Sequence, residues 1–256
     1  MPIYSLKNQK FIIGSWAVVL DFLLGNGLQK LTKNSISQII LPCSLHDLAL
    51  CSQNNELSVK YKLVDYCTSD STFLKWFFSW RYRILVDRIY GPNLMLKALA
   101  KTIRVSPQKK HYFLSPNSKV ETSLQKILKN QHQSLRADYL VLTKKEFSAL
   151  QKIIKAKPDF VWLGVGSPKQ VELAVYLKKH LRGAKIFCVG AAFEFITKQK
   201  KQAPHFFQLF GLEWFFRLIM EPRRLWRRYL VTIPKFLFIN FWLVFFRRFF
   251  KHLKQV

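Results

Sequence analysis

Acidic residues are scarce in this chain. Its 256 residues include only 14 Asp and Glu against 42 Lys and Arg, which gives a formal net charge of +28. Such a surface attracts polyanions, either an anionic membrane or nucleic acid. Aromatic residues make up 15% of the chain, and aromatic rings settle at the headgroup level of bilayers, so we favour a membrane. The sequence contains no recognisable RNA- or DNA-binding module, which argues against nucleic acid as a partner.

The few carboxylates also lack the spacing of a metal site. No two aspartates are separated by a single residue, so no Asp-x-Asp pair is present to hold a divalent ion on a nucleotide diphosphate. The cysteines form no Cys-x-x-Cys pair, and no histidine lies at ligand spacing from Cys43, Cys51, Cys67 or Cys188. We therefore expect no metal, no cofactor and no disulfide framework, with the reduced thiols of a cytosolic protein.

Long apolar runs are missing too. A membrane-spanning helix needs about 20 apolar residues, and residues 236–246 form an eleven-residue apolar run with one asparagine. Residues 222–256 contain nine Lys and Arg, ten aromatics and no Asp or Glu. This composition favours a helix lying in the membrane interface with its basic residues reaching the headgroups. The alternative is a core helix that docks on the rest of the protein.

Residues 212–230 combine aromatic and basic side chains in an unusual way. We expect a helix that buries one apolar face, consisting of Trp214, Phe215, Leu218 and Ile219. Pro222 interrupts that helix and begins a second short one reaching about residue 230. Five arginines in the stretch face only two nearby glutamates: Arg217, Arg223, Arg224, Arg227 and Arg228. The guanidinium fork suits phosphate, so an external anion is one interpretation and a solvated basic face is the other.

Strand and helix patterns alternate along the middle of the chain. Apolar strands are expected at 39–41, 61–66, 111–114, 137–142, 160–164 and 185–189, and helices at 45–51, 73–86, 94–103, 118–129, 144–154 and 171–181. Residues 11–24 are interpreted as one or two strands, and 28–39 have a helical period. The alternation predicts an α/β core, a mostly parallel Rossmann-like sheet flanked by helices, over residues 1–204. Residues 205–256 then form a basic, aromatic, helical C-terminal appendage that associates with a membrane.

Ligands of such sheets bind at the carboxyl ends of the strands. Asp70, the glycine-rich loop 164–170 and the loop 190–194 all follow predicted strands. The loop at 164–170 can present backbone N–H groups to a phosphate, although glycines also make tight turns for structural reasons. Asp70 is a candidate general base, and the alternative is an aspartate that makes a turn hydrogen bond.

Several motifs point to a known family. They are Gly-Ser-Pro-Lys-Gln at 166–170, Val-Gly-Ala-Ala-Phe-Glu-Phe at 189–195, Ala-Pro at 203–204, Gly-Leu-Glu-Trp-Phe-Phe-Arg at 211–217 and Glu-Pro-Arg-Arg-Leu-Trp-Arg-Arg-Tyr-Leu at 221–230. Together they resemble the WecG/TagA/CpsF family of bacterial glycosyltransferases, glycosyltransferase family 26. Upstream, the segments around Asp70 and around Arg88 look like two further family motifs.

The resemblance implies an inverting, metal-independent glycosyltransferase. It would move an N-acetylmannosamine-type sugar from a UDP donor to a polyprenyl-diphosphate-linked sugar, on the cytoplasmic face of the membrane, in cell-envelope polysaccharide synthesis. It implies Asp70 as the base that deprotonates the acceptor. It assigns nucleotide and diphosphate binding to Arg88, Gly166, Ser167, Pro168, Lys169, Gln170 and Gly190. Acceptor diphosphate and membrane contacts would come from Arg217, Arg224, Arg227 and Arg228.

The chain departs from the family pattern at several positions. Val171 stands where the family has an acidic residue, and Glu172 is the nearest substitute. Asn93 replaces an aspartate, and Leu41 aligns with a threonine that follows the first core strand. These departures lie on the nucleotide and donor-sugar side. They leave two possibilities open, a different donor sugar and a catalytically impaired relative that acts as a membrane-associated interaction protein.

Overall fold

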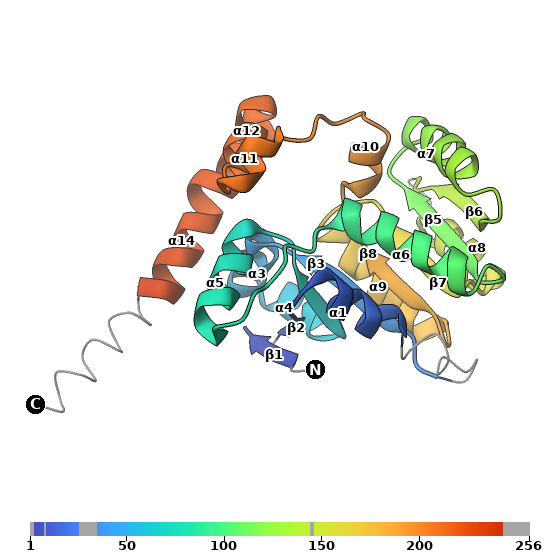
Figure 1. Cartoon of the computed structure of the whole chain (residues 1–256), viewed down its shortest axis with the longest axis horizontal. Helices are drawn as coiled ribbons and strands as arrows, with labels where there is room; N and C mark the ends of the chain where they lie inside the picture. The colour runs from blue at the N-terminus through green and yellow to red at the C-terminus, as the bar shows by residue number, and fades with distance from the viewer. Residues whose placement is uncertain (1–2, 8, 26–34, 144–145, 243–256) are drawn as a thin grey trace, which may run out of the picture. The chain divides into compact units, whose positions relative to one another are not determined.

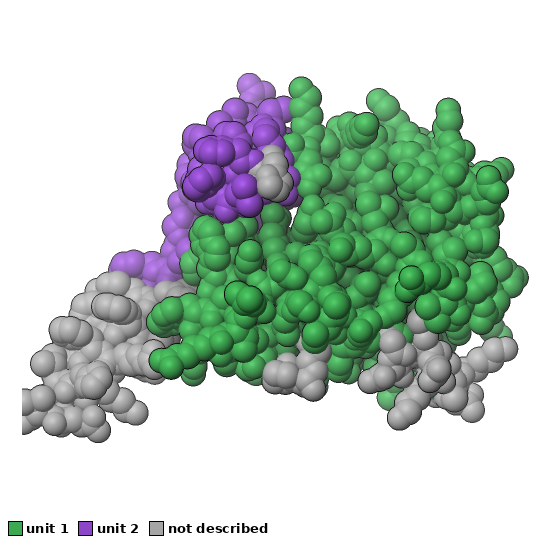
Figure 2. Space-filling view, in the orientation of Figure 1, with its two compact units in different colours: residues 1–44, 59–202 green, residues 45–58, 203–256 purple. Residues whose placement is uncertain are grey.

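The computed structural model describes residues 3–7, 9–25, 35–143 and 146–242. The chain divides into two compact units, coloured green and purple in Figure 2. Unit 1 contains residues 1–44 and 59–202, and unit 2 contains residues 45–58 and 203–256. Unit 2 is therefore assembled from two segments that are far apart in the sequence.

Unit 1 is built on an eight-stranded sheet with the order β1-β2-β4-β3-β8-β7-β5-β6. β1 and β2 pair antiparallel, and every other pairing between the named strands is parallel. The strands are β1 Ile3–Leu6, β2 Gln9–Ile12, β3 Gln38–Cys43, β4 Tyr66–Ser69, β5 Lys110–Ser115, β6 Arg136–Val141, β7 Phe160–Leu163 and β8 Lys185–Cys188. The predicted α/β class with a mostly parallel sheet is confirmed.

Helices cover both faces of this sheet. One layer holds α1 Trp16–Leu20, the π-helix η1 Asp21–Gly25, α6 Gly91–Val105, α7 Ser118–Gln131 and α10 Ala192–Ile196. In Figure 1, α1 and α6 lie in front of the strands. On the other face, α9 Lys169–His180 contacts β3 and β8, and α8 Glu146–Ala156 contacts α9. The remaining helices of this unit are α4 Asn55–Lys62, which begins in unit 2, and α5 Thr72–Tyr82.

A row of stacked rings crosses the sheet on the α6 side. His111 and Phe113 of β5 lie beside Phe160 and Trp162 of β7, with Phe187 of β8 beyond them. The Trp162 and Phe187 ring centroids are 4.4 Å apart with an interplanar angle of 17°. Side chains two residues apart share one face of a strand, so these rings form a continuous layer across neighbouring strands. The residues between these rings are buried on the other face, as the fully buried β7 and β8 show, so these strands consist mainly of apolar residues.

The N-terminal prediction was wrong in part. Residues 11–24 contain the end of β2, but residues 16–25 are helical instead of extended. An apolar run of this length cannot be told from a buried helix by periodicity alone. The missed signal is Ser15, whose side chain accepts a bond from the Val18 N–H at the N-cap of α1.

Two other boundaries also shift. The strand expected at 61–66 begins only at Tyr66, because α4 continues to Lys62. The helical period expected at 28–39 falls mostly on residues 26–34, which lie outside the described residues, and Gln38 and Ile39 belong to β3. The helix expected at 73–86 ends at Tyr82, where Arg83 takes a left-handed conformation.

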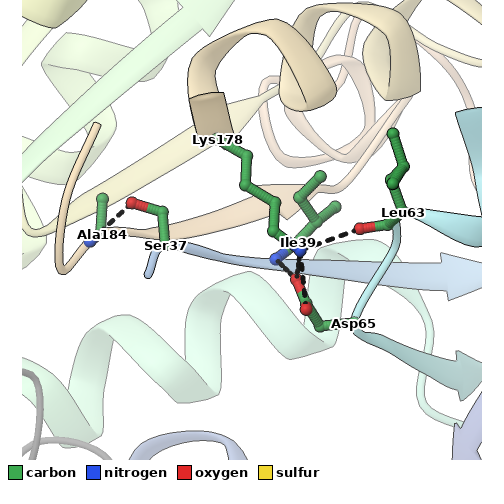
Figure 3. A network of polar contacts seen from close by, with 6 residues as sticks. All are labelled: Ser37, Ile39, Leu63, Asp65, Lys178 and Ala184. Atoms are coloured by element: carbon green, nitrogen blue, oxygen red, sulfur yellow. Dashed lines mark hydrogen bonds and ion pairs between the residues drawn. The ribbon is translucent and has the colours of Figure 1, made fainter. Parts of the chain in front are cut away.

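A polar network joins β3, β4 and α9 at the amino-terminal edge of the sheet (Figure 3). The Lys178 ammonium lies 2.7 and 2.6 Å from the two Asp65 carboxylate oxygens and 3.1 Å from the Leu63 carbonyl oxygen. The Ile39 N–H donates to the same carboxylate at 2.7 Å. Asp65 therefore fixes the start of β4 against β3 and anchors α9 to both strands. This edge is opposite to the one that carries Asp70.

We expect the Lys178→Met variant to lose about 1–2 kcal/mol of unfolding free energy, because it leaves a partly buried carboxylate with only its backbone donor. The matched control is Lys179→Met, which removes an exposed lysine from the same helix. Denaturant unfolding of the two variants measures the difference. Equal stability of both variants would show that the network contributes nothing.

The described residues of unit 2 form helices and short connecting segments, with no strand among them. Its elements are α3 Leu45–Gln53, α11 His205–Leu209, α12 Glu213–Met220, α13 Pro222–Trp226, the π-helix η2 Arg227–Thr232, α14 Ile233–Leu237 and the π-helix η3 Phe238–Trp242. The predicted break at Pro222 is confirmed, since α12 ends before it and α13 begins on it. The second helix does not stop near residue 230 but continues to Trp242. Pro234 lacks an N–H, and η2 lies just before it, where the regular ladder is interrupted.

The predicted buried face of α12 was wrong. Trp214, Phe215 and Ile219 are 41%, 44% and 60% exposed, and α12 buries none of its residues. Unit 2 is small, so it has too few elements to cover this apolar stripe. The apolar run 236–246 is helical over 236–242, and its remainder lies outside the described residues. Within the described residues, no helix combines the length and apolar character needed to cross a membrane.

Candidate functional site

The candidate site lies at the carboxyl edge of four neighbouring parallel strands. β4, β3, β8 and β7 are adjacent in that order. Asp70 directly follows β4, and its N–H donates to the Cys43 carbonyl at the end of β3, at 3.2 Å. Gly190 lies just beyond β8, and the loop 164–168 follows β7. Strands are spaced by about 4.8 Å, so the ends of β4 and β8 are about 10 Å apart.

The structure brings Asp70 and Arg88 together, two residues to which the sequence analysis gave separate roles. The Arg88 Nε–H donates to the Asp70 backbone carbonyl at 2.6 Å. The segment carrying Arg88 is held along β4, because the Ile89 N–H donates to the Ser69 carbonyl at 2.9 Å and the Ser69 hydroxyl donates to the Asp87 carbonyl at 2.8 Å. Both Asp70 and Arg88 are half-buried. The Arg88 guanidinium is thus held beside the backbone of Asp70 at the end of β4.

Tyr90 supports Arg88 and was not singled out from the sequence. The Arg88 guanidinium carbon lies 4.6 Å from the centroid of the Tyr90 ring. The Tyr90 hydroxyl accepts a bond from Gln202 Nε2 at 3.0 Å, which links this residue to the end of unit 1. A guanidinium stacked on a ring keeps its orientation. The sequence signal for Tyr90 is its aromatic ring two positions after a candidate site arginine.

Gln170 joins the loop after β7 to the loop after β8. Its Oε1 accepts the Gly190 N–H at 2.8 Å, and its Nε2 donates to the Ser167 hydroxyl at 3.0 Å. The Gly190 N–H is a donor, so it identifies the amide oxygen unambiguously. Gln170 is only 4% exposed, which means that its amide orders both loops from within the fold. Its predicted contact with a nucleotide stays a prediction.

The two loop glycines have conformations that other residues adopt rarely. Gly166 has φ +81° and Gly190 has φ +58°. A Cβ placed on Gly166 would meet no protein atom within 4 Å, so this backbone borders open space. A left-handed glycine with an open flank lets a ligand approach the main chain closely. The arrangement fits a phosphate-binding loop, and the contact of Gly166 and Gly190 with a nucleotide stays a prediction.

Other residues near this loop face elsewhere. Lys169 forms an ion pair with Glu146 of α8. Glu172 pairs with Lys60 of α4 at 2.8 Å, so it is engaged away from the position that Val171 occupies. Val171 itself is fully buried. Pro168, with a cis peptide bond before it, precedes the first residue of α9. The acidic position of the family therefore has no substitute from the neighbouring glutamate.

Leu41 lies inside β3 instead of after it. It pairs with Cys67 of β4 and is fully buried, so it cannot contact a ligand. The residue that follows β3 is Ser44, a nearly buried hydroxyl that the sequence analysis missed. The sequence signal for Ser44 is its place directly after an apolar strand, at the edge of the sheet where ligands bind. Asn93 lies in the first turn of α6 and is half-buried.

The predicted arginines of unit 2 fall into two groups. Arg217 pairs with Glu213 at 2.9 Å, and Arg224 pairs with Glu221 one helical turn away. Arg227 is exposed, and Arg228 is half-buried with its guanidinium 5.3 Å from the centroid of the Tyr229 ring. The local glutamates therefore engage two of the four predicted phosphate ligands.

Unit 2 also contains a histidine that the sequence analysis passed over. Burial, with a further contribution from the nearby Arg228 charge, lowers the pKa of His46 to about 4, while Asp47 acts in the opposite direction. The His46 Nδ1 atom is buried without a hydrogen-bond partner among the described residues. His46 and Arg228 come from α3 and η2, two elements that contact each other within unit 2. The long separation in sequence hid this proximity.

The described residues contain no group of three or more His, Cys, Asp or Glu side chains arranged to hold a metal ion. Each of the four cysteines lies in the described part of the chain, is buried, and carries a thiol instead of a disulfide. Independence from metals and cofactors stays a prediction, because only a measurement of activity can test it.

Comparison with known proteins gives the family directly. The model of the "Glycosyl transferase WecG/TagA/CpsF family" matches residues 22–251. The chain belongs to this family. The motif resemblance was strongest from residue 160 onward. The family match extends well upstream of that residue and includes both Asp70 and Arg88. The resemblance drawn from the motifs is thereby confirmed.

Among the curated relatives are enzymes of Staphylococcus aureus named N-acetylglucosaminyldiphosphoundecaprenol N-acetyl-beta-D-mannosaminyltransferase. The protein of strain MW2 is 30% identical over 157 residues, that of strain NCTC 8325 / PS 47 is 29% identical over 157 residues, and that of strain MRSA252 is 28% identical over 158 residues. Each match covers 60% of this chain and 60% of the relative. The matches thus span less than two thirds of the length of these relatives.

Proposed function

We propose that this chain is an inverting, metal-independent glycosyltransferase of the WecG/TagA/CpsF family. It transfers an N-acetylmannosamine-type sugar from a UDP donor to a polyprenyl-diphosphate-linked sugar during cell-envelope polysaccharide synthesis. Membership in the family supports the reaction class. The names of the relatives support the choice of sugar and of lipid-linked acceptor.

The observation that carries the proposal is the hydrogen bond from Arg88 to the Asp70 backbone carbonyl, which places both residues at the end of β4. In the proposed step, the Asp70 carboxylate removes the proton of the acceptor hydroxyl while that oxygen attacks the anomeric carbon. The bond between the anomeric carbon and the UDP oxygen breaks with inversion, and UDP leaves. The Arg88 guanidinium neutralises the charge that develops on the departing diphosphate.

The donor would occupy the loops after β7 and β8. Backbone N–H groups around Gly166 and Gly190 offer donors to the nucleotide phosphates, and Gln170 keeps the two loops in register. The end of β8 is two strand spacings, about 10 Å, from the end of β4. A donor whose diphosphate lies on the loop after β8 would extend its sugar toward Asp70.

The acceptor is a membrane lipid, so the enzyme would work peripherally on the cytoplasmic face of the membrane. Exposed apolar side chains of unit 2, among them Trp214, Ile219 and Phe238, support contact with lipid. Arg217, Arg224, Arg227 and Arg228 would bind the acceptor diphosphate, with the first two exchanging their glutamate partners for phosphate.

The test is a donor panel. Purified full-length protein is incubated with a set of UDP-sugars and a GlcNAc-diphospho-lipid, once with EDTA and once with added Mg²⁺. We expect turnover with UDP-N-acetylmannosamine or a related UDP-sugar, at the same rate under both conditions. Activity that EDTA abolishes would contradict the metal-independent mechanism. Failure of every donor, with vesicle binding retained, would favour the catalytically impaired relative.

A further inference from the structure

The outer face of α5 is an exposed aromatic surface on unit 1. Trp76 is 50% exposed and Trp80 is 69% exposed, one helical turn apart. Leu85, just beyond the helix, is 93% exposed. α5 buries Leu74 and Phe78 against the sheet, and residues two apart lie about 200° around a helix. The tryptophans therefore point away from the core. Packing inside the unit does not explain why such large apolar side chains occupy these exposed positions.

The charge around this face has one sign. Lys75, Arg81 and Arg83 lie on or next to α5, and residues 71–86 contain no Asp or Glu. The β1–β2 hairpin reaches the end of the helix, since the Tyr4 and Tyr82 ring centroids are 3.8 Å apart. Residues 3–13 of that hairpin contain no Asp or Glu either. The partner that complements this surface is consequently anionic as well as apolar.

We propose that the face formed by Trp76, Trp80 and Leu85, with Arg81 and Arg83 beside it, is a second site of contact with an anionic lipid bilayer. Indole rings settle at the headgroup level, and arginine reaches the lipid phosphates from there. A second copy of this chain fits poorly, because two identical cationic faces repel each other. Nucleic acid would leave the Leu85 side chain in water.

The position of the face gives it a role. α5 begins at Thr72, two residues after Asp70, and Ser71 caps it by accepting the Leu74 N–H at 3.2 Å. A bilayer contact on α5 would hold the lipid surface near the proposed base without depending on unit 2. The inference rests on the proposed function, in which the acceptor is a lipid of the membrane.

The buried native cysteines allow a direct test on the full chain. Trp80→Cys, labelled with the fluorophore nitrobenzoxadiazole, is mixed with phosphatidylcholine vesicles that contain or lack phosphatidylglycerol. We expect a blue shift and a several-fold rise in emission on the anionic vesicles. The control is Phe147→Cys with the same label, at a residue of α8 that is 64% exposed, and its emission should hardly change.

A second measurement covers the lipid affinity itself. The double variant Trp76→Ser/Trp80→Ser should bind anionic vesicles about tenfold more weakly, whereas Phe147→Ser should bind as the parent does. Transfer to a water-soluble acceptor analogue should be unchanged in both. The inference would be overturned if the protein bound vesicles while the emission of the label at residue 80 stayed unchanged. It would also be overturned if that emission responded to DNA or to protein concentration alone. A responding label in a protein with no transferase activity would reject the proposed function and leave the surface intact.

Discussion

Asp70→Asn is expected to lower kcat by about a thousandfold, within the range that removal of a general base produces. Asparagine has nearly the shape of aspartate but cannot take a proton from the acceptor hydroxyl. The backbone carbonyl of residue 70, which accepts the Arg88 bond, remains in place, so Arg88 should keep its position. Initial rates with saturating donor and acceptor measure the effect, and donor affinity should change little.

The matched control is Asp138→Asn. Asp138 lies on β6 at the far edge of the sheet and pairs with Lys110 at 2.8 Å. This variant removes one negative charge from the same unit without touching the candidate site, so its kcat should equal that of the parent. Full activity of Asp70→Asn, measured beside this control, would remove Asp70 as the base.

The second large effect is a loss of stability in acid. Burial lowers the pKa of His111 to about 4, against a small opposing influence of Asp159. In the unfolded chain the histidine pKa is near 6.5. Between about pH 6.5 and pH 4, His111 is therefore protonated in the unfolded chain and neutral in the folded one. His111 contributes its full stability above pH 6.5, and about 3 kcal/mol is lost as the pH falls to 4.

His111 cannot relieve this by moving, because its Nδ1 accepts the Trp162 Nε1–H at 3.1 Å and its ring stacks on Phe160 with centroids 4.8 Å apart. His111→Gln keeps an acceptor for the tryptophan and removes the titrating ring. It should be less stable at pH 7 but show a smaller decrease in unfolding free energy between pH 7 and pH 5.

Phe113→Leu is the control for that experiment. It weakens the same row of rings, on the same strand, while His111 is retained, so the parent pH dependence should persist. Chemical denaturation at several pH values gives the slopes. His46 in unit 2 titrates in the same direction, so the comparison rests on the difference between variants. An unchanged slope in His111→Gln would show that another group causes the acid sensitivity.

The α/β class and the placement of Asp70 could be predicted because buried parallel strands are solid apolar segments followed by polar loops. Strands β3, β5, β6, β7 and β8 were found within a few residues of their ends. The region before Ser15 was ambiguous because an apolar run has no period to separate strand from helix. The apolar face of α12 was wrongly predicted to be buried. An amphipathic stripe indicates a covering partner but does not show that this partner belongs to the same chain.

The inner workings of the candidate site depend on pairs that are distant in sequence. Gln170 and Gly190 meet only because β7 and β8 are neighbours. Arg88 meets Asp70 only because residues 87–89 run along β4. No local pattern encodes such pairs, and here the family motifs supplied the residues while the fold supplied the geometry.

Unit 2 is joined to unit 1 at three points along the backbone: after Ser44, inside α4 between Ser58 and Val59, and after Gln202. A protein cut short at residue 202 would retain α3 but lose η2 and α14, the helices that α3 contacts. Such a truncation would strip a helix of its partners instead of removing a detachable tail. We therefore expect deletion of the C-terminal helices to disturb α3 as well, so their proposed contribution to lipid binding is best measured by point substitutions in the intact chain.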